Sequence, residues 1–127
     1  MTNSIKKGNQ GQRDVANMFK RWFPQAQSSS HAQRNPDSKL PDIIGGVEKY
    51  FYVEVKRYKK IRPKQLRDWF SKAVDDEEAF NHTAETEVLI VYRKDRDKWR
   101  IFSRCDEDWD IFSKKLDKSF GVVDDSR

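Results

Sequence analysis

Residues 41–56 read PDIIGGVEKYFYVEVK, and the fold is most evident from this segment. Its pattern predicts two short strands, near residues 42–47 and 50–56, joined by a tight turn at the pair of glycines. A returning strand of this length brings Asp42 opposite the end of the second strand, although twelve positions separate Asp42 from Glu54.

Side chains alternate between the two faces of a strand, so the second strand has one polar and one apolar face. Glu54 and Lys56 lie on the first, and Phe51, Val53 and Val55 on the second. Two carboxylates on neighbouring strands can hold a hard divalent cation, and a lysine beside them can reach a water or a phosphate. This arrangement predicts a nuclease. The alternative is an ordinary half-buried edge strand whose Glu and Lys are solvated.

The composition indicates one domain, residues 1–127, in which residues 1–8 and 122–127 form flexible tails. Only 35% of the residues are hydrophobic, so a core of this size must depend on its large aromatic side chains. A single cysteine excludes an internal disulfide and favours a reducing, cytoplasmic setting. Because no apolar run is long enough to span a bilayer, we expect no membrane partner.

Basic residues follow the candidate site directly. Residues 56–67 contain seven Lys and Arg and no acid, within a chain of net charge +5. A basic block beside a carboxylate pair suits a polyanionic substrate, because phosphate neutralisation supplies most non-specific affinity for nucleic acid. The alternative is a solvated charged face.

Helices are predicted before and after the two strands in the sequence. Apolar residues predict helices over residues 9–23, 63–80 and from Asp106 to Gly121, with Asp106 as the N-cap and Gly121 as the stop. Two further strands are predicted at residues 87–92 and 99–102. The order predicts an α/β (α+β) fold, a mixed central sheet flanked by helices.

Three segments in this order resemble one family. Pro41-Asp42, eleven further residues and then Glu54-Val55-Lys56 resemble the PD-(D/E)xK motif of restriction-endonuclease-like nucleases. Residues 7–14, KGNQGQRD, resemble the opening helix of archaeal Holliday junction resolvases and related phage nucleases, and residues 64–73 resemble the helix that follows their active site. The resemblance covers about residues 7–102.

The resemblance implies a two-strand metal site. Asp42 and Glu54 would ligate Mg²⁺ or Mn²⁺, helped by the carbonyl of Val55. Lys56 would orient or deprotonate the attacking water, or stabilise the transition state. The sequence departs from the family pattern at Gln12, where the resolvases carry a glutamate. Gln12 can still offer an amide oxygen to the site.

We expect DNA contacts from the basic block, the first helix and the polar loop before the first strand. The candidates are Lys7, Arg13, Ser30, His31, Arg34, Arg57, Lys59, Lys60, Arg62, Lys64 and Gln65. Two of them have an alternative role, His31 as a surface histidine and Gln65 as a side chain that serves exposed backbone N–H groups of the helix start.

The resemblance implies a metal-dependent DNA endonuclease of phage origin that cleaves branched DNA such as Holliday junctions and acts in the host cytoplasm. Because junction resolution needs two symmetric incisions, we also expect a homodimer, for which the hairpin at residues 87–102 and the last helix are candidate interfaces. One alternative is the same chemistry on single-stranded, flap or nicked DNA. Another is a DNA-binding module with weak or lost catalysis.

Overall fold

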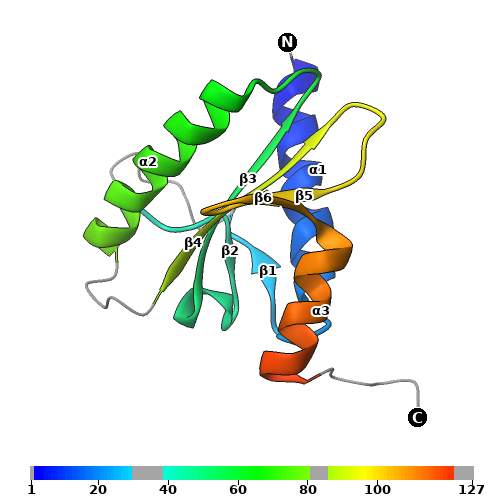
Figure 1. Ribbon diagram of the computed structural model, residues 1–127. Coiled ribbons are helices and arrows are strands. Elements are labelled where there is room, and N and C mark those ends of the chain that lie inside the picture. Colours follow the sequence, from blue (N-terminus) through cyan, green and yellow to red (C-terminus); the bar gives the residue numbers. More distant parts are fainter. Residues whose placement is uncertain (1, 30–38, 81–85, 122–127) are drawn as a thin grey trace.

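The computed structural model describes residues 2–29, 39–80 and 86–121 of the chain. A sheet of four strands is flanked by three α-helices in this part of the protein (Figure 1). The elements are α1 (Thr2–Phe19), β1 (Gln27–Ser28), β2 (Ile43–Ile44), a 3-10 turn (Val47–Lys49), β3 (Phe51–Tyr58), α2 (Pro63–Phe80), β4 (Glu87–Lys94), β5 (Arg100–Phe102), β6 (Asp106–Asp108) and α3 (Trp109–Phe120).

The sheet is mixed, with strand order β3-β4-β5-β6. β3 runs parallel to β4, with Val55 opposite Val91, and α2 forms the crossover between them. β4, β5 and β6 are antiparallel neighbours. The predicted fold class, a mixed sheet flanked by helices, is confirmed. β3 lies at an edge of this sheet, so one side of its backbone is open to other partners.

The two faces of the sheet bury separate cores. On one face Phe51, Val53 and Val55 pack with residues of α1 and α3. On the other face Tyr52 packs with residues of α2. Figure 1 shows α2 on one side of the sheet and α1 with α3 on the other. The alternation predicted for β3 is therefore confirmed.

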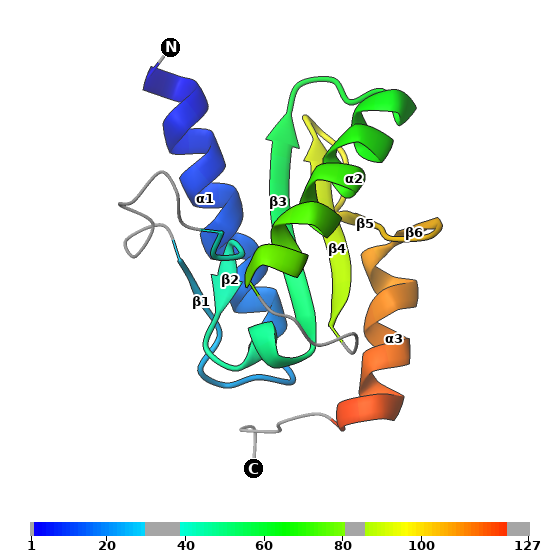
Figure 2. The same cartoon turned by 90° about the vertical axis from the view of Figure 1, so that its left-hand side faces the viewer.

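A small second sheet corrects the predicted hairpin. β2 pairs with β1 in antiparallel fashion, and the short turn at residues 47–49 precedes β3 where a direct hairpin was expected. Gly45 explains this geometry: its φ is 89°, and a Cβ there would lie 1.9 Å from the carbonyl oxygen of Gln25. The close crossing of two chain segments bends residues 41–46 out of a regular hairpin. Figure 2 shows β1 and β2 beside α1.

The boundaries of the first two helices are partly as expected. α2 begins at Pro63 and ends at Phe80, as predicted. α1 begins at Thr2, so residues 2–8 are helical rather than a flexible tail, and it ends at Phe19, four residues earlier than predicted. The predicted tail at residues 122–127 lies outside the described part.

The last helix begins later than predicted. α3 starts at Trp109 with Asp108 as its N-cap, because Asp106 is used in β6. Gly121 follows its last residue and is the C-cap, as predicted. Among the described residues no helix is both long and apolar enough to cross a membrane.

Candidate active site

Asp42 is docked onto the edge of β3 by hydrogen bonds in both directions. Its backbone N–H donates to the carbonyl of Val53 (2.8 Å), and its Oδ2 accepts from the N–H of Val55 (2.7 Å). The residue is 7% exposed. A carboxylate that accepts a buried backbone N–H is held in one orientation. The prediction that Asp42 lies beside the end of β3 is confirmed, although the contact is local rather than part of a strand ladder.

Ser29 holds the backbone of Asp42 and of the preceding proline by hydrogen bonds. It is fully buried, its N–H donates to the carbonyl of Asp42 (2.8 Å), and its hydroxyl donates to the carbonyl of Pro41 (2.6 Å). On the other side of the segment, the hydroxyl of Tyr52 donates to the carbonyl of Lys39 (2.7 Å). The chain before β2 is therefore held from two directions, which leaves the Asp42 carboxylate little freedom.

Glu54 lies in β3 on the face towards α2, and its carboxyl is largely enclosed. Burial, followed by the negative charge of Asp42, raises the pKa of Glu54 to about 8, although the charges of Lys56 and Lys72 act to lower it. Burial removes the hydration that stabilises the ionised form, and a like charge nearby has the same effect. The metal-free site therefore resists holding both carboxyl groups in the ionised form, and a bound cation would favour that form.

Lys56 follows Glu54 on the same face of β3. Its ammonium Nζ lies 5.3 Å from the centre of the Trp69 ring in α2, a distance at which the ring attracts a cation. Tyr58 stacks on the same indole, with ring centres 5.4 Å apart and planes 18° apart. Trp69 therefore limits where the lysine can reach while leaving its charge near Glu54.

The oxygen atoms at this edge suit a hard divalent cation. Asp42 and Glu54 provide two carboxylates, and the carbonyl of Val55 points to the same side of the strand as its N–H, away from β4. Within the described residues no three His, Cys, Asp or Glu side chains come together in a metal-holding group. Two carboxylates and a carbonyl are typical of an ion that keeps several of its waters, as Mg²⁺ does.

Gln12 is partly buried on α1. Its side-chain oxygen accepts a hydrogen bond from the hydroxyl of Ser28 (2.9 Å), next to the Ser29 that supports Asp42. The described contacts therefore bring Gln12 to β1 rather than to the two carboxylates. A direct role for Gln12 in the site stays a prediction.

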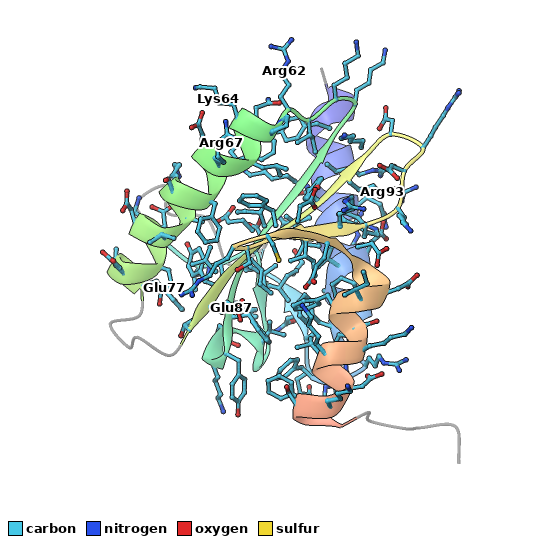
Figure 3. The ribbon with its side chains drawn as sticks, viewed as in Figure 1. Arg62, Lys64, Arg67, Glu77, Glu87 and Arg93 are labelled. Carbon is cyan, nitrogen blue, oxygen red and sulfur yellow. The ribbon has the colours of Figure 1, made fainter. Side chains whose placement is uncertain are left out.

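Gln65 has the alternative role considered from the sequence. Its side-chain oxygen accepts from the N–H of Arg62 (2.8 Å), which closes the first turn of α2 as a capping contact. The rest of the basic block is at the surface: Lys59, Lys60, Arg62 and Lys64 are exposed, and Arg57 is half-buried. Figure 3 shows Arg62, Lys64 and Arg67 projecting from the start of α2.

Other predicted DNA contacts fall elsewhere. Arg13 is exposed on α1 and donates to the side chain of Gln10 (2.9 Å). Lys7 lies in α1, and its side chain is outside the described part. Ser30, His31 and Arg34 also lie outside the described residues.

Sequence reasoning did not identify Lys72 and Asp76 of α2 as neighbours of the site. Their ion pair (3.0 Å) lies close enough for both charges to act on Glu54, and Asp76 also pairs with Lys39 (3.5 Å). The available signal was helical spacing, since residues 65, 69, 72 and 76 recur at intervals of three or four along one side of α2. Only the packing of α2 on the sheet shows which side faces Glu54.

Comparisons with known proteins identify a family. The family described as "Phage putative PDDEXK endonuclease" matches residues 3–124. No curated protein matches the sequence. Among solved structures, the Holliday junction resolvase Hjc of Archaeoglobus fulgidus is similar, with 19% identity, coverage of 84% of this chain and 93% of that chain, and a TM-score of 0.45. The match to the family spans nearly the whole chain, and the chain therefore belongs to the phage PDDEXK endonuclease family.

Proposed function

We propose that this endonuclease hydrolyses DNA with Mg²⁺ or Mn²⁺ held by Asp42 and Glu54, and that it prefers branched DNA such as four-way junctions. The observation that carries the proposal is the carboxylate pair at the edge of β3. Asp42 is fixed by the N–H of Val55, and its charge helps to raise the pKa of Glu54 to about 8. A bound divalent cation would offset the repulsion between the two carboxylates. A pair with only a structural role would have no such compensation.

Each residue of the site has a defined task. Asp42, Glu54 and the carbonyl of Val55 would hold the cation, which when bound supplies an activated water and neutralises phosphate charge. Lys56 stabilises negative charge on the phosphate in the transition state, because the Trp69 ring provides a place for a cationic ammonium near Glu54. We assign this role in preference to general base catalysis.

The basic surface would bind the DNA backbone. Lys59, Lys60, Arg62 and Lys64 are exposed around the loop between β3 and α2, close in sequence to Lys56. Such side chains bind phosphates without reading sequence. We extend the proposal to Lys7, Arg13, Arg57 and Gln65, and to the polar loop residues Ser30, His31 and Arg34.

The preference for junctions rests on the resemblance of residues 7–14 to the opening helix of resolvases. Paired incisions in a junction require two active sites, so we propose a homodimer with two-fold symmetry. The β4–β5 hairpin and α3 remain the candidate interfaces. Light scattering of the purified protein, alone and with junction DNA, tests this part.

The central experiment compares cleavage of labelled four-way junction, duplex and single-stranded DNA in Mg²⁺, in Mn²⁺ and in EDTA. The variants are Asp42→Asn, Glu54→Gln and Lys56→Met, which keep side-chain size while removing charge. Asp75→Asn, on an exposed position of α2, is the matched control. We expect metal-dependent cleavage by the wild type and the control, a loss of at least about a hundredfold in the site variants, and DNA binding retained by all.

The possible outcomes separate the alternatives. Paired cuts confined to the junction support the resolvase-like function. Cuts only in single-stranded or duplex DNA keep the chemistry and replace the substrate. Tight binding without cleavage in either metal identifies a DNA-binding module, and unchanged cleavage by the site variants shows that the assigned site is wrong.

A further inference from the structure

A second concentration of charge lies between α1, the end of β3 and the β4–β5 hairpin. It is a cavity of about 980 Å³, which we call the arginine hollow. Its charged lining consists of Arg13, Arg57, Arg93, Asp95 and Arg96. Four positive groups from three separate segments thus face one carboxylate. Figure 3 shows Arg93 at this hairpin, to the right of the start of α2.

The hollow and the carboxylate pair lie on opposite faces of the sheet. Arg57 and Lys56 are neighbours in β3, so their side chains leave the strand in opposite directions. Lys56 lies over Trp69 of α2, whereas Arg57 packs towards α1, where a Cβ on Gly11 would lie 3.5 Å from its Cβ. α1 therefore packs directly against the end of β3 at Gly11.

Among the residues whose side chains the structure describes (9–29, 39–80 and 86–121), the four arginines of the hollow form no ion pair of 4 Å or less. Arg13 donates to the neutral side chain of Gln10, and Arg93 Nε donates to the backbone carbonyl of Asp97 (2.7 Å). The Nε of Arg57 is buried and has no hydrogen-bond partner in this part of the chain. Guanidinium groups arranged in this way have donors available for an anion with several oxygens.

We propose that the arginine hollow binds backbone phosphates of a second DNA segment, on the face of the sheet opposite the phosphate that is cleaved. The inference rests on the proposed nuclease function and adds a binding site to it. The exposed residues Lys59 and Lys60 follow the end of β3, between Arg57 and the basic start of α2. Backbone phosphates can therefore follow positive charge from one face to the other, and the cavity is large enough for more than a single phosphate.

Two binding sites on opposite faces have a consequence for substrate choice. A straight duplex engages one face, whereas a junction, with arms leaving in different directions, can engage both. Once one face has bound DNA, another arm of the same junction is present at a high effective concentration near the other face. The second contact would therefore favour branched DNA without contacting any base.

The test removes two charges from the hollow and compares the result with removal of two charges elsewhere. Arg93→Gln/Arg96→Asn is the hollow variant; Asn suits position 96, where φ is 65°. Arg104→Gln/Lys118→Gln, at exposed positions outside the hollow lining, is the control with the same net charge. Affinity for a four-way junction is measured without metal over a range of salt concentrations. We expect the hollow variant to bind about tenfold more weakly, with a salt slope smaller by about one to two, and the control to match the wild type.

Identical affinity and salt slope in the two double variants would overturn the inference. Cleavage of a short single-stranded oligonucleotide should be unchanged in the hollow variant; an equal loss there would place these arginines in the active site instead. Calorimetry with inorganic pyrophosphate distinguishes a small-anion site: pyrophosphate binding that the hollow variant loses, with DNA affinity unchanged, would overturn the DNA assignment. Arg96→Asn alone provides a second variant if the double substitution unfolds.

The proposed nuclease function and the proposed second binding site would fail in different experiments. Wild-type protein that cleaves no DNA in Mg²⁺ or Mn²⁺ refutes that proposal. The binding comparison is made without metal, so it still shows whether the hollow binds DNA.

Discussion

Glu54→Gln should remove the pH dependence of stability that Glu54 gives the metal-free protein. The pKa of Glu54 in the folded chain is about 8, raised from 4.5 by burial and by the charge of Asp42. The folded state therefore binds the proton more tightly than the unfolded state, and its stability falls as pH rises from about 5 to about 8. At about 1.4 kcal/mol for each tenfold change in proton affinity, the loss is at most about 5 kcal/mol. Gln resembles the protonated carboxyl and does not titrate, so the variant should avoid this loss.

The assay is urea unfolding in EDTA at pH 5.5, 7 and 8.5. We expect the variant to exceed the wild type by only about 1.4 kcal/mol at pH 5.5 and by several kcal/mol at pH 8.5. Glu78→Gln, the same change at an exposed position of α2, is the control and should follow the wild type. Adding Mg²⁺ at pH 8.5 should raise the stability of the wild type and leave the Glu54→Gln variant nearly unchanged, because ligands stabilise only the state that binds them.

Equal stability of the wild type and Glu54→Gln across this pH range would contradict this account, because it would mean that Glu54 is neither enclosed nor close to Asp42. Destabilisation of the variant at every pH would show that the carboxylate accepts a hydrogen bond that Gln cannot replace. In either case the electrostatic argument for a cation at this edge would fail.

Three further predictions concern other parts of the structure. Gly45→Ala should cost more than about 3 kcal/mol in urea unfolding, because it adds a clash with a backbone carbonyl to the strain of a positive φ; Gly121→Ala, with φ of 70° and open space around it, should cost only about 1–2 kcal/mol. Trp69→Leu should slow single-turnover cleavage severalfold with DNA affinity unchanged, since it removes a cation–π contact worth about 0.5–2 kcal/mol; unchanged cleavage would contradict this role. Hydrogen bonds from Arg21 and Trp22 lower the pKa of Asp117 to about 2, so this carboxylate should lose its stabilising effect between pH 4 and pH 2, and circular dichroism should show a smaller fall in stability over this range for Asp117→Asn than for the wild type.

The sequence predicted those features that depend on local periodicity. Alternation in residues 51–56 placed Glu54 and Lys56 together, and the apolar spacing of residues 63–80 predicted α2 with its correct first and last residues. Both signals repeat over several residues, so a single exception does not change the interpretation. The ends of a helix have no such repetition, which is why Asp106 was predicted as the cap of α3 where the structure has Asp108.

Contacts between distant segments depend on the tertiary structure. The carboxylate of Asp42 takes its orientation from Val55, and its backbone is supported by Ser29, whereas the sequence indicated only a hairpin. The arginine hollow combines α1, β3 and the β4–β5 hairpin, which no spacing along the chain relates. The sequence alone specifies which residues share a face of one helix or strand, because backbone geometry sets that locally. Which faces meet depends on how the elements pack, and the active site and its charge arise from that packing.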